Sequence, residues 1–170
     1  IKSVRQIVRL DDAVAVVADH MGAAKKGLAA LKIEWTDGPH AKLSTADIAR
    51  ELEQATLRSG AVAQNIGDVG KAMASAATKV EATYHVPFLA HATMEPMNCT
   101  VHVRKDECEI WIGSQAVTRV QAFAAKAADL SPEKVIVHNH LLGGGFGRRL
   151  EAGGAARAVQ IAPHVHGPVK

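Results

Sequence analysis

The stretch VIVHNHLLGGGFGRRL, residues 135–150, places a strand-like apolar run directly before a glycine-rich loop. Four glycines surround Phe146, and Arg148 and Arg149 follow. Glycines allow positive φ angles and let backbone N–H groups approach a ligand closely. The alanine-rich run 151–162 then predicts a helix, whose N-terminus would attract an anion. The segment therefore predicts a strand–loop–helix unit whose loop either binds an anion or only turns tightly.

Two established nucleotide-binding motifs do not fit this loop. A dinucleotide fold requires GxGxxG, but Arg148 or Leu150 stands where the third glycine is needed, depending on the register. A phosphate-binding loop of nucleotide hydrolases requires GxxxxGK, and the position five residues after Gly143 is again Arg148. The loop is therefore not a standard nucleotide site.

Strands and helices alternate along the rest of the chain. Apolar alternation and β-branched runs predict strands at 4–10, 14–18, 32–35, 79–86, 99–103 and 108–112. Helical spacing and capping residues predict helices at 20–31, 45–57, 67–77 and 115–130. This order predicts an α+β or mixed α/β fold. Residues 1–170 are expected to be part of one domain, which divides, if at all, into residues 1–60 and 61–170.

Composition excludes several classes of protein. The chain has 170 residues, of which 48% are hydrophobic and 22% charged, as expected for a globular domain with a core. Its 20 basic and 17 acidic residues are scattered and give a net charge of only +3, so no nucleic-acid-binding face is predicted. No apolar run approaches the roughly 18 residues that a transmembrane helix needs.

The residue types that bind metals do not form a recognisable site. Cys99 and Cys108 are nine positions apart, without the spacing of a zinc or iron–sulfur motif. The paired histidines lack a carboxylate or third histidine at a suitable spacing; they are His138 with His140 and His164 with His166. We therefore predict no metal ion ligated by protein side chains.

Two further stretches contain candidate functional residues. PFLAHATMEPMNC, residues 87–99, places Glu95 in an otherwise apolar loop, where it would be a site residue if buried and a solvated carboxylate if not. IWIGSQ, residues 110–115, places Gln115 where a strand passes into a helix. Its amide either contacts a ligand at the strand ends or caps the helix and faces water.

Together, PFLAHATMEPMNC, EIWIGSQAVTRVQ and VIVHNHLLGGGFGRR occur in an order that resembles the molybdopterin-binding large subunit of the molybdenum hydroxylases. The resemblance is to the isoquinoline 1-oxidoreductase and aldehyde dehydrogenase type, related to xanthine dehydrogenase and aldehyde oxidase. It extends upstream through residues 14–35 and 67–88, and so covers nearly the whole chain. It implies a fragment of the molybdopterin-binding domain of that family, with the C-terminal remainder lying beyond Lys170.

The resemblance also implies roles for individual residues. Cofactor-binding residues would be Gln115, as a hydrogen-bond donor, and the loop residues Gly144, Gly145, Phe146 and Gly147. Glu95 and Arg148 would belong to a substrate pocket. Purine-oxidising relatives have a glycine, a lysine and a glutamate where this chain has Arg148, Arg149 and Leu150, which favours the isoquinoline type. No residue of this chain matches the family's general-base glutamate, so none is predicted to be catalytic.

The implied reaction is hydroxylation of an N-heteroaromatic or aldehyde carbon, with oxygen from water. The cofactor would be molybdopterin, with the cytosine dinucleotide form as one variant. Electrons would pass to iron–sulfur clusters on a small partner subunit. The isolated chain is expected to be inactive, and the bacterial periplasm is favoured over the cytoplasm. Two alternatives stay open on the residues alone: an anion- or phosphate-binding module, and a structural interaction domain without catalysis.

Overall fold

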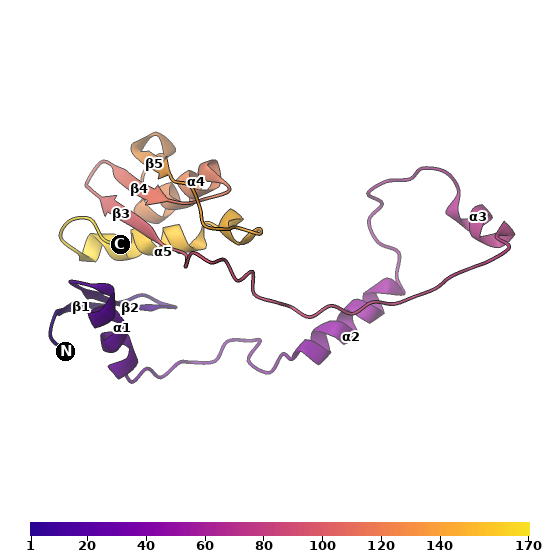
Figure 1. The fold of residues 1–170 in the computed structure, drawn as a ribbon, viewed down its shortest axis with the longest axis horizontal. Coiled ribbons are helices and arrows are strands. Elements are labelled where there is room, and N and C mark those ends of the chain that lie inside the picture. The colour runs from indigo at the N-terminus through magenta and orange to yellow at the C-terminus, as the bar shows by residue number, and fades with distance from the viewer. The chain divides into compact units, whose positions relative to one another are not determined.

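The computed structural model describes residues 1–170 as two compact units. Unit 1 comprises Ile1–Leu31 and Phe88–Lys170, and unit 2 comprises Lys32–Pro87. Five α-helices, three short 3-10 helices and two small sheets occur in the order shown by Figure 1. The predicted α+β class is confirmed.

Unit 1 is built around a three-stranded sheet with the order β3–β4–β5. Strands β3 (Cys99–Val103) and β4 (Cys108–Ile112) form the predicted antiparallel hairpin. Strand β5 (Val135–Asn139) pairs in parallel with β4, so Ile110 lies opposite Val137. Because β4 and β5 are parallel, their carboxyl ends lie at the same edge of the sheet.

Two helices pack on one face of this sheet. Helix α4 (Val117–Ala128) and the 3-10 helix η1 (Pro132–Lys134) make the crossover that a parallel pair requires. Helix α5 (Gly153–Ile161) follows the glycine-rich loop and leads into the 3-10 helix η3 (Ala162–His164). Figure 1 shows α4 and α5 beside the sheet. The sequence pattern predicted both α4 and α5.

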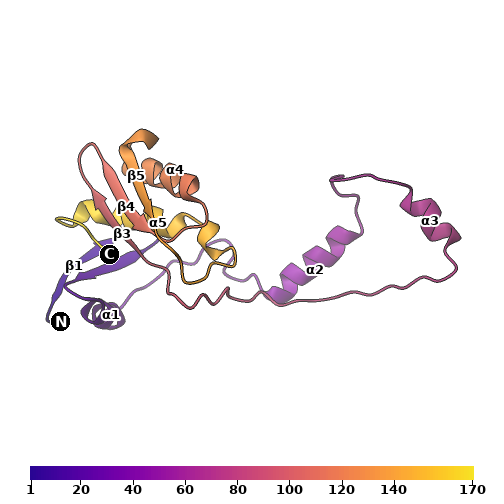
Figure 2. The same cartoon turned by 45° about the horizontal axis from the view of Figure 1, so that its top comes forward.

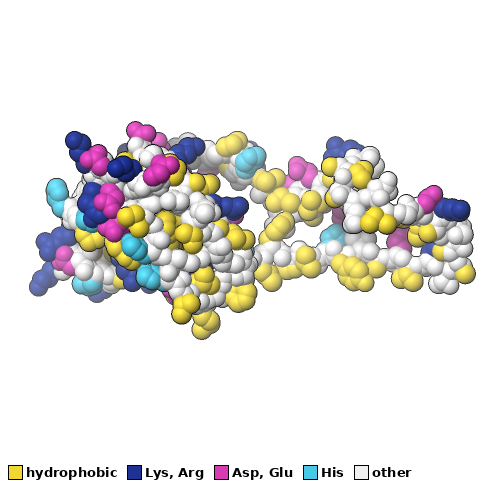
Figure 3. Space-filling model, turned by 90° about the horizontal axis from the view of Figure 1, so that it is seen from above, with side chains coloured by type: hydrophobic (Ala, Val, Ile, Leu, Met, Phe, Trp, Pro, Cys, Tyr) yellow, Lys and Arg dark blue, Asp and Glu magenta, His cyan; other side chains and the backbone are white.

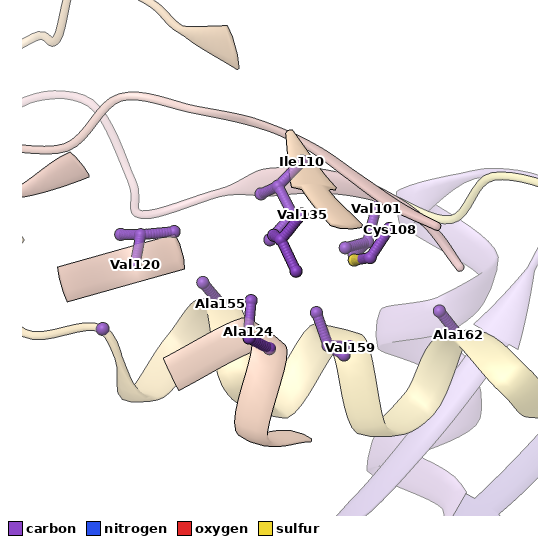
Figure 4. Packing of buried hydrophobic residues seen from close by; sticks show 11 residues of the cluster. Val101, Cys108, Ile110, Val120, Ala124, Val135, Ala155, Val159 and Ala162 are labelled. Atoms are coloured by element: carbon purple, nitrogen blue, oxygen red, sulfur yellow. The ribbon is translucent and has the colours of Figure 1, made fainter. Parts of the chain in front are cut away.

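The core of unit 1 lies between the sheet and these helices. Strand side chains alternate between faces, and only one face meets the helices. Many helical contributions are alanines, which allow the backbones to approach closely. The buried residues of this core, most of them labelled in Figure 4, are Val101, Cys108, Ile110 and Val135 from the strands, Val120, Ala124 and Ala125 from α4, and Ala152, Ala155, Val159 and Ala162 from the α5 region.

The first thirty residues form a hairpin and a helix. Strands β1 (Val4–Arg9) and β2 (Val14–Ala18) are antiparallel, and α1 (Met21–Ala30) packs on them. A Cβ atom on Gly27 would lie 2.7 Å from Cγ1 of Val16, so glycine permits this close packing. The turn of the hairpin is joined to α5 by a bidentate ion pair between Asp12 and Arg157, with N–O distances of 2.6 and 2.7 Å. Figure 2 shows this hairpin next to the C-terminal part of the chain.

Unit 2 contains two helices and no strand. Helix α2 (Thr45–Thr56) begins at the predicted capping box, in which Ser44 and Asp47 bond each other's backbone N–H groups. Helix α3 (Val69–Ser75) is capped by Asp68. The strands predicted at 32–35 and 79–86 do not form, and those two predictions were wrong. A strand needs a partner for its N–H and C=O groups, and the unit offers none.

The surface agrees with the even charge composition. On the face that Figure 3 shows, acidic and basic side chains of unit 1 are intermixed. Several are paired, including Arg5 with Asp19 and Arg104 with Glu109, both at an N–O distance of 2.6 Å. No helix has the length and apolar character that would let it cross a bilayer.

Candidate functional site

The three stretches singled out from the sequence meet at the carboxyl edge of β4 and β5. Gln115 follows β4, and the glycine loop (residues 142–150) follows β5. A third segment, the Glu95 loop (residues 87–98), precedes β3 and contacts the glycine loop through a backbone bond from Glu95 N–H to the Gly143 carbonyl, 3.2 Å. In sheets of parallel strands, ligands commonly bind outside the carboxyl ends. This edge is therefore the candidate site.

Gln115 lies directly against the glycine loop. Its Oε1 accepts a hydrogen bond from the Gly147 backbone N–H at 3.2 Å. A Cβ atom on Gly145 would lie 2.5 Å from the same oxygen, closer than any real contact, so only glycine fits there. Because Oε1 is used in this bond, the Nε2 N–H groups of Gln115 remain to donate to a ligand.

The backbone of the loop adopts conformations that side chains rarely permit. Gly144 has a φ of 101° and Gly147 a φ of 89°. Phe146 has a φ of 52° although it is not glycine, and its side chain is 75% exposed. Such strained residues concentrate at functional sites, where surrounding contacts hold them. The loop therefore has a defined backbone conformation that surrounding contacts maintain, and the Phe146 side chain is exposed.

Glu95 is tied to the glycine loop by its carboxylate. Oε2 accepts from the Gly143 backbone N–H at 2.8 Å, and Oε1 accepts from the Asn98 amide at 3.1 Å. These two bonds and the nearby Arg149 guanidinium lower the pKa of Glu95, so it is ionised at neutral pH. A Cβ atom on Gly143 would lie 2.6 Å from the Glu95 Cβ, which explains the first glycine of the loop.

Arg149 is the residue that sequence reasoning missed. Its side chain is only 2% exposed and lies within the 3-10 helix η2 (Arg148–Leu150). The guanidinium donates to the Gly144 carbonyl at 2.7 Å and to the Glu95 carbonyl and carboxylate, both at 2.9 Å. The Arg149 carbonyl accepts from the Ser114 hydroxyl and the Gln115 N–H, both at 3.2 Å. The sequence pattern does not indicate which of the two adjacent arginines is buried; only the fold does.

An open hollow of about 510 Å³ lies between the glycine loop and the Glu95 loop. Arg148 lines this hollow, whereas Glu95 is not among its lining residues and is engaged with Gly143 and Arg149. The lining also includes Gly147 of the glycine loop. The full set is Ala90, His91, Ala92, Thr93, Met97, Gly147, Arg148 and Glu151.

Metal ligation and thiol chemistry do not point to this edge. No group of three or more His, Cys, Asp or Glu side chains is close enough together to hold a metal ion. Both cysteines are free, and burial raises the pKa of Cys108 to about 11, so it is a neutral core thiol at neutral pH. What the site offers is the Gln115 amide N–H group and the glycine-loop backbone beside an open hollow.

The chain is similar to known proteins over most of its length. The family model of the molybdopterin cofactor-binding domain matches residues 51–170. The chain is 35% identical over 139 residues to a membrane-bound aldehyde dehydrogenase [pyrroloquinoline-quinone] of Gluconacetobacter polyoxogenes, covering 81% of this chain and 18% of that protein. It is 27% identical over 182 residues to the isoquinoline 1-oxidoreductase subunit beta of Brevundimonas diminuta, covering 100% of this chain and 23% of that protein.

A relative with lower identity also matches most of the chain. Xanthine dehydrogenase/oxidase of Rattus norvegicus is 26% identical over 161 residues, which is 92% of this chain and 12% of that protein. The chain thus spans about a fifth of the length of the first two relatives. In the family match, Gln115, the glycine loop and the Glu95 loop all fall inside the matched residues.

Proposed function

The chain belongs to the molybdopterin cofactor-binding domain family of the molybdenum hydroxylases, and from this premise we propose that Gln115 and the glycine loop form one wall of a molybdopterin site in an oxidoreductase. The observation that carries the proposal is the bond from the Gly147 N–H to Gln115 Oε1 at 3.2 Å. It joins two segments that are distant in the sequence and orients the free end of the amide.

The residues present fit such a cofactor. A Cβ atom at Gly147 would have no atom within 4 Å, so the backbone there is open to a close approach. Gln115 Nε2 supplies a neutral hydrogen-bond donor, while Gly144, Gly145 and Phe146 form the wall beside it. When bound, the cofactor supplies the two-electron chemistry that protein side chains lack. This chain's residues bind and orient the group and leave room for it.

The substrate side of the site is proposed to be the hollow next to Gly147. Arg148 lines it and would contact the substrate, whereas Glu95, in the adjacent loop, would support the pocket through its bond to Gly143. The substrate class is an N-heteroaromatic ring or an aldehyde, hydroxylated at carbon with water as the oxygen source. The substrate class rests on the resemblance of the glycine loop to the isoquinoline 1-oxidoreductase and aldehyde dehydrogenase type. The location of the pocket rests on the open hollow beside the strained backbone.

Several finer features are part of the same proposal. Electrons would leave the site through iron–sulfur clusters on a partner subunit, and the cofactor would be molybdopterin, with the cytosine dinucleotide form as one variant. We assign no general base among residues 1–170, because none of them matches the glutamate to which the resemblance gives this role. The isolated chain is accordingly proposed not to turn over substrate.

The test is cofactor content in a variant that replaces the amide donor by a carboxylate. Gln115→Glu keeps an oxygen for the Gly147 N–H but lacks N–H groups. We measure molybdenum by elemental analysis, and pterin by the fluorescence of its oxidised form, in protein purified with its own cofactor. Q115E is expected to lose most of both relative to wild type, whereas the control Gln54→Glu on the exposed surface of α2 should lose neither. Equal cofactor content in both variants would overturn the proposal.

The same preparation distinguishes the competing readings. One relative's name includes pyrroloquinoline quinone, so released small molecules are also identified by mass spectrometry. Recovery of a quinone without pterin would contradict a molybdopterin site. Phosphate-dependent thermal stabilisation that is unaffected by Q115E would support an anion-binding module instead, and the absence of every ligand effect would support a structural domain.

A further inference from the structure

We propose that Arg149, working with Glu95, is a positioning residue that fixes the glycine loop against Gln115. That this positioning affects cofactor binding rests on the function proposed above. The positioning itself can be tested in this chain without a cofactor. Arg149 does not line the hollow, so we assign it no contact with cofactor or substrate.

The contacts of Arg149 reach all three segments of the site. Its guanidinium bonds the Gly144 carbonyl in the glycine loop at 2.7 Å. Two further bonds, both 2.9 Å, reach the carbonyl and carboxylate of Glu95. Its own carbonyl receives the Ser114 hydroxyl and the Gln115 N–H, each at 3.2 Å, at the end of β4. One buried residue therefore joins the two loops and the strand end.

The chemistry of these bonds requires an arginine. A guanidinium is planar and presents several N–H groups in a fixed fork, so it can bond carbonyl and carboxylate oxygens lying in different directions. A lysine ammonium would retain the charge but not the fork. A buried cation is also costly unless it is paired, and Glu95 provides the pairing carboxylate at its side.

The carboxylate of Glu95 completes the connection. Its Oε2 accepts both the Arg149 guanidinium and the Gly143 N–H, the latter at 2.8 Å. The first glycine of the loop and the η2 arginine are thus held by one oxygen atom. Between these two points lie Gly144, Phe146 and Gly147, all at positive φ. Only Phe146 is strained by its positive φ, because glycine adopts such angles freely. Strained backbone persists where surrounding contacts hold it, and the bonds of Glu95 and Arg149 are among these contacts.

The two adjacent arginines, Arg148 and Arg149, therefore have different structural roles. Arg148 is exposed and lines the hollow, whereas Arg149 is buried beneath the loop. This difference provides a matched pair of variants. Arg148→Lys and Arg149→Lys make the same chemical change at neighbouring positions, and only the second should loosen the loop.

The experiment is hydrogen–deuterium exchange of the 170-residue chain, read on peptides covering 143–149. With Arg149→Lys, exchange in these peptides should be on the order of tenfold faster, because bonds to a charged group are lost. Peptides from α4 serve as the internal reference and should not change. Arg148→Lys should leave both sets unchanged. Equal exchange of the loop peptides in wild type and R149K, with R149K folded, would overturn the proposal.

A second variant covers the case in which R149K does not fold. Glu95→Gln keeps the shape of the side chain but removes its charge, and should also speed exchange in the loop peptides. If E95Q leaves the loop protected, the positioning proposal is wrong. Pterin content, measured separately in the cofactor-loaded protein, should fall in both variants. A loosened loop in a protein that never binds pterin would support the positioning role while contradicting the proposed function.

Discussion

The amide oxygen of Gln115 lies 3.2 Å from the backbone nitrogen of Gly147, although 32 residues separate them in the sequence. The contact forms because β4 and β5 are parallel neighbours and end at the same edge of the sheet. It brings two short motifs together in one surface. Four measurements can test the structure of this surface and of the core beneath it.

Gly145→Ala should displace the Gln115 side chain. The new Cβ would lie 2.5 Å from Gln115 Oε1, so the bond to the Gly147 N–H would be lost. We expect faster hydrogen exchange in the loop and reduced pterin content, with the α4 and α5 core intact by circular dichroism. The control is Gly153→Ala, where an added Cβ meets nothing within 4 Å. Indistinguishable loop exchange in the two variants would show that Gln115 is not in contact with Gly145.

The contribution of Glu95 to stability should depend on pH. Bonds from the Gly143 N–H and Asn98, together with the Arg149 guanidinium, lower the pKa of Glu95 below its ordinary value of 4.5. A lowered folded-state pKa means that this contribution is complete above the unfolded-state pKa and is lost as pH falls through the folded-state pKa. Urea unfolding of wild type and E95Q at a series of pH values measures the difference. It should be largest near neutral pH and shrink below about pH 4; a difference independent of pH would refute the assignment.

Cys108 should resist thiol reagents in the native protein. Burial raises its pKa to about 11 and also raises the pKa of Cys99. Since the thiolate is the reactive species, labelling at pH 8 should be slow until urea unfolds the chain, when both thiols react. Cys108→Ser identifies which thiol any native labelling comes from. Rapid modification of Cys108 in folded protein would mean that the core between the sheet and the helices is not formed.

Ile110→Ala should destabilise unit 1 strongly. Ile110 is fully buried at the centre of β4, and removing three carbons from a core site costs about 2–5 kcal/mol. Ile136 lies on the neighbouring strand β5 but is 42% exposed, so Ile136→Ala should cost under about 1.5 kcal/mol. Chemical denaturation monitored by tryptophan fluorescence gives both values. Similar losses at the two positions would contradict the observed facing of the sheet.

Local sequence signals predicted most elements correctly, because they depend on neighbours in the chain. Ser44 and Asp47 mark the start of α2 through bonds within one turn, and Pro163 follows the last residue of α5 closely. The same reasoning failed at 32–35 and 79–86, which have strand-like patterns without a strand to pair with. In α4, the apolar residue Phe123 is 51% exposed, because Val120, Ala124 and Ala125 form the buried face of the helix.

The sequence by itself determined the α+β class, because that class follows from the periodicity of its elements. It also indicated the family, through the resemblance that the order of its short motifs carries. It also placed Gln115 and the glycine loop among the candidate residues. Only the tertiary structure decided which of two adjacent arginines is buried, and that Glu95 bonds Gly143 and Arg149 and does not line the hollow. Those facts depend on the parallel pairing of β4 with β5, which brings the Gln115 segment and the glycine loop to one edge of the sheet.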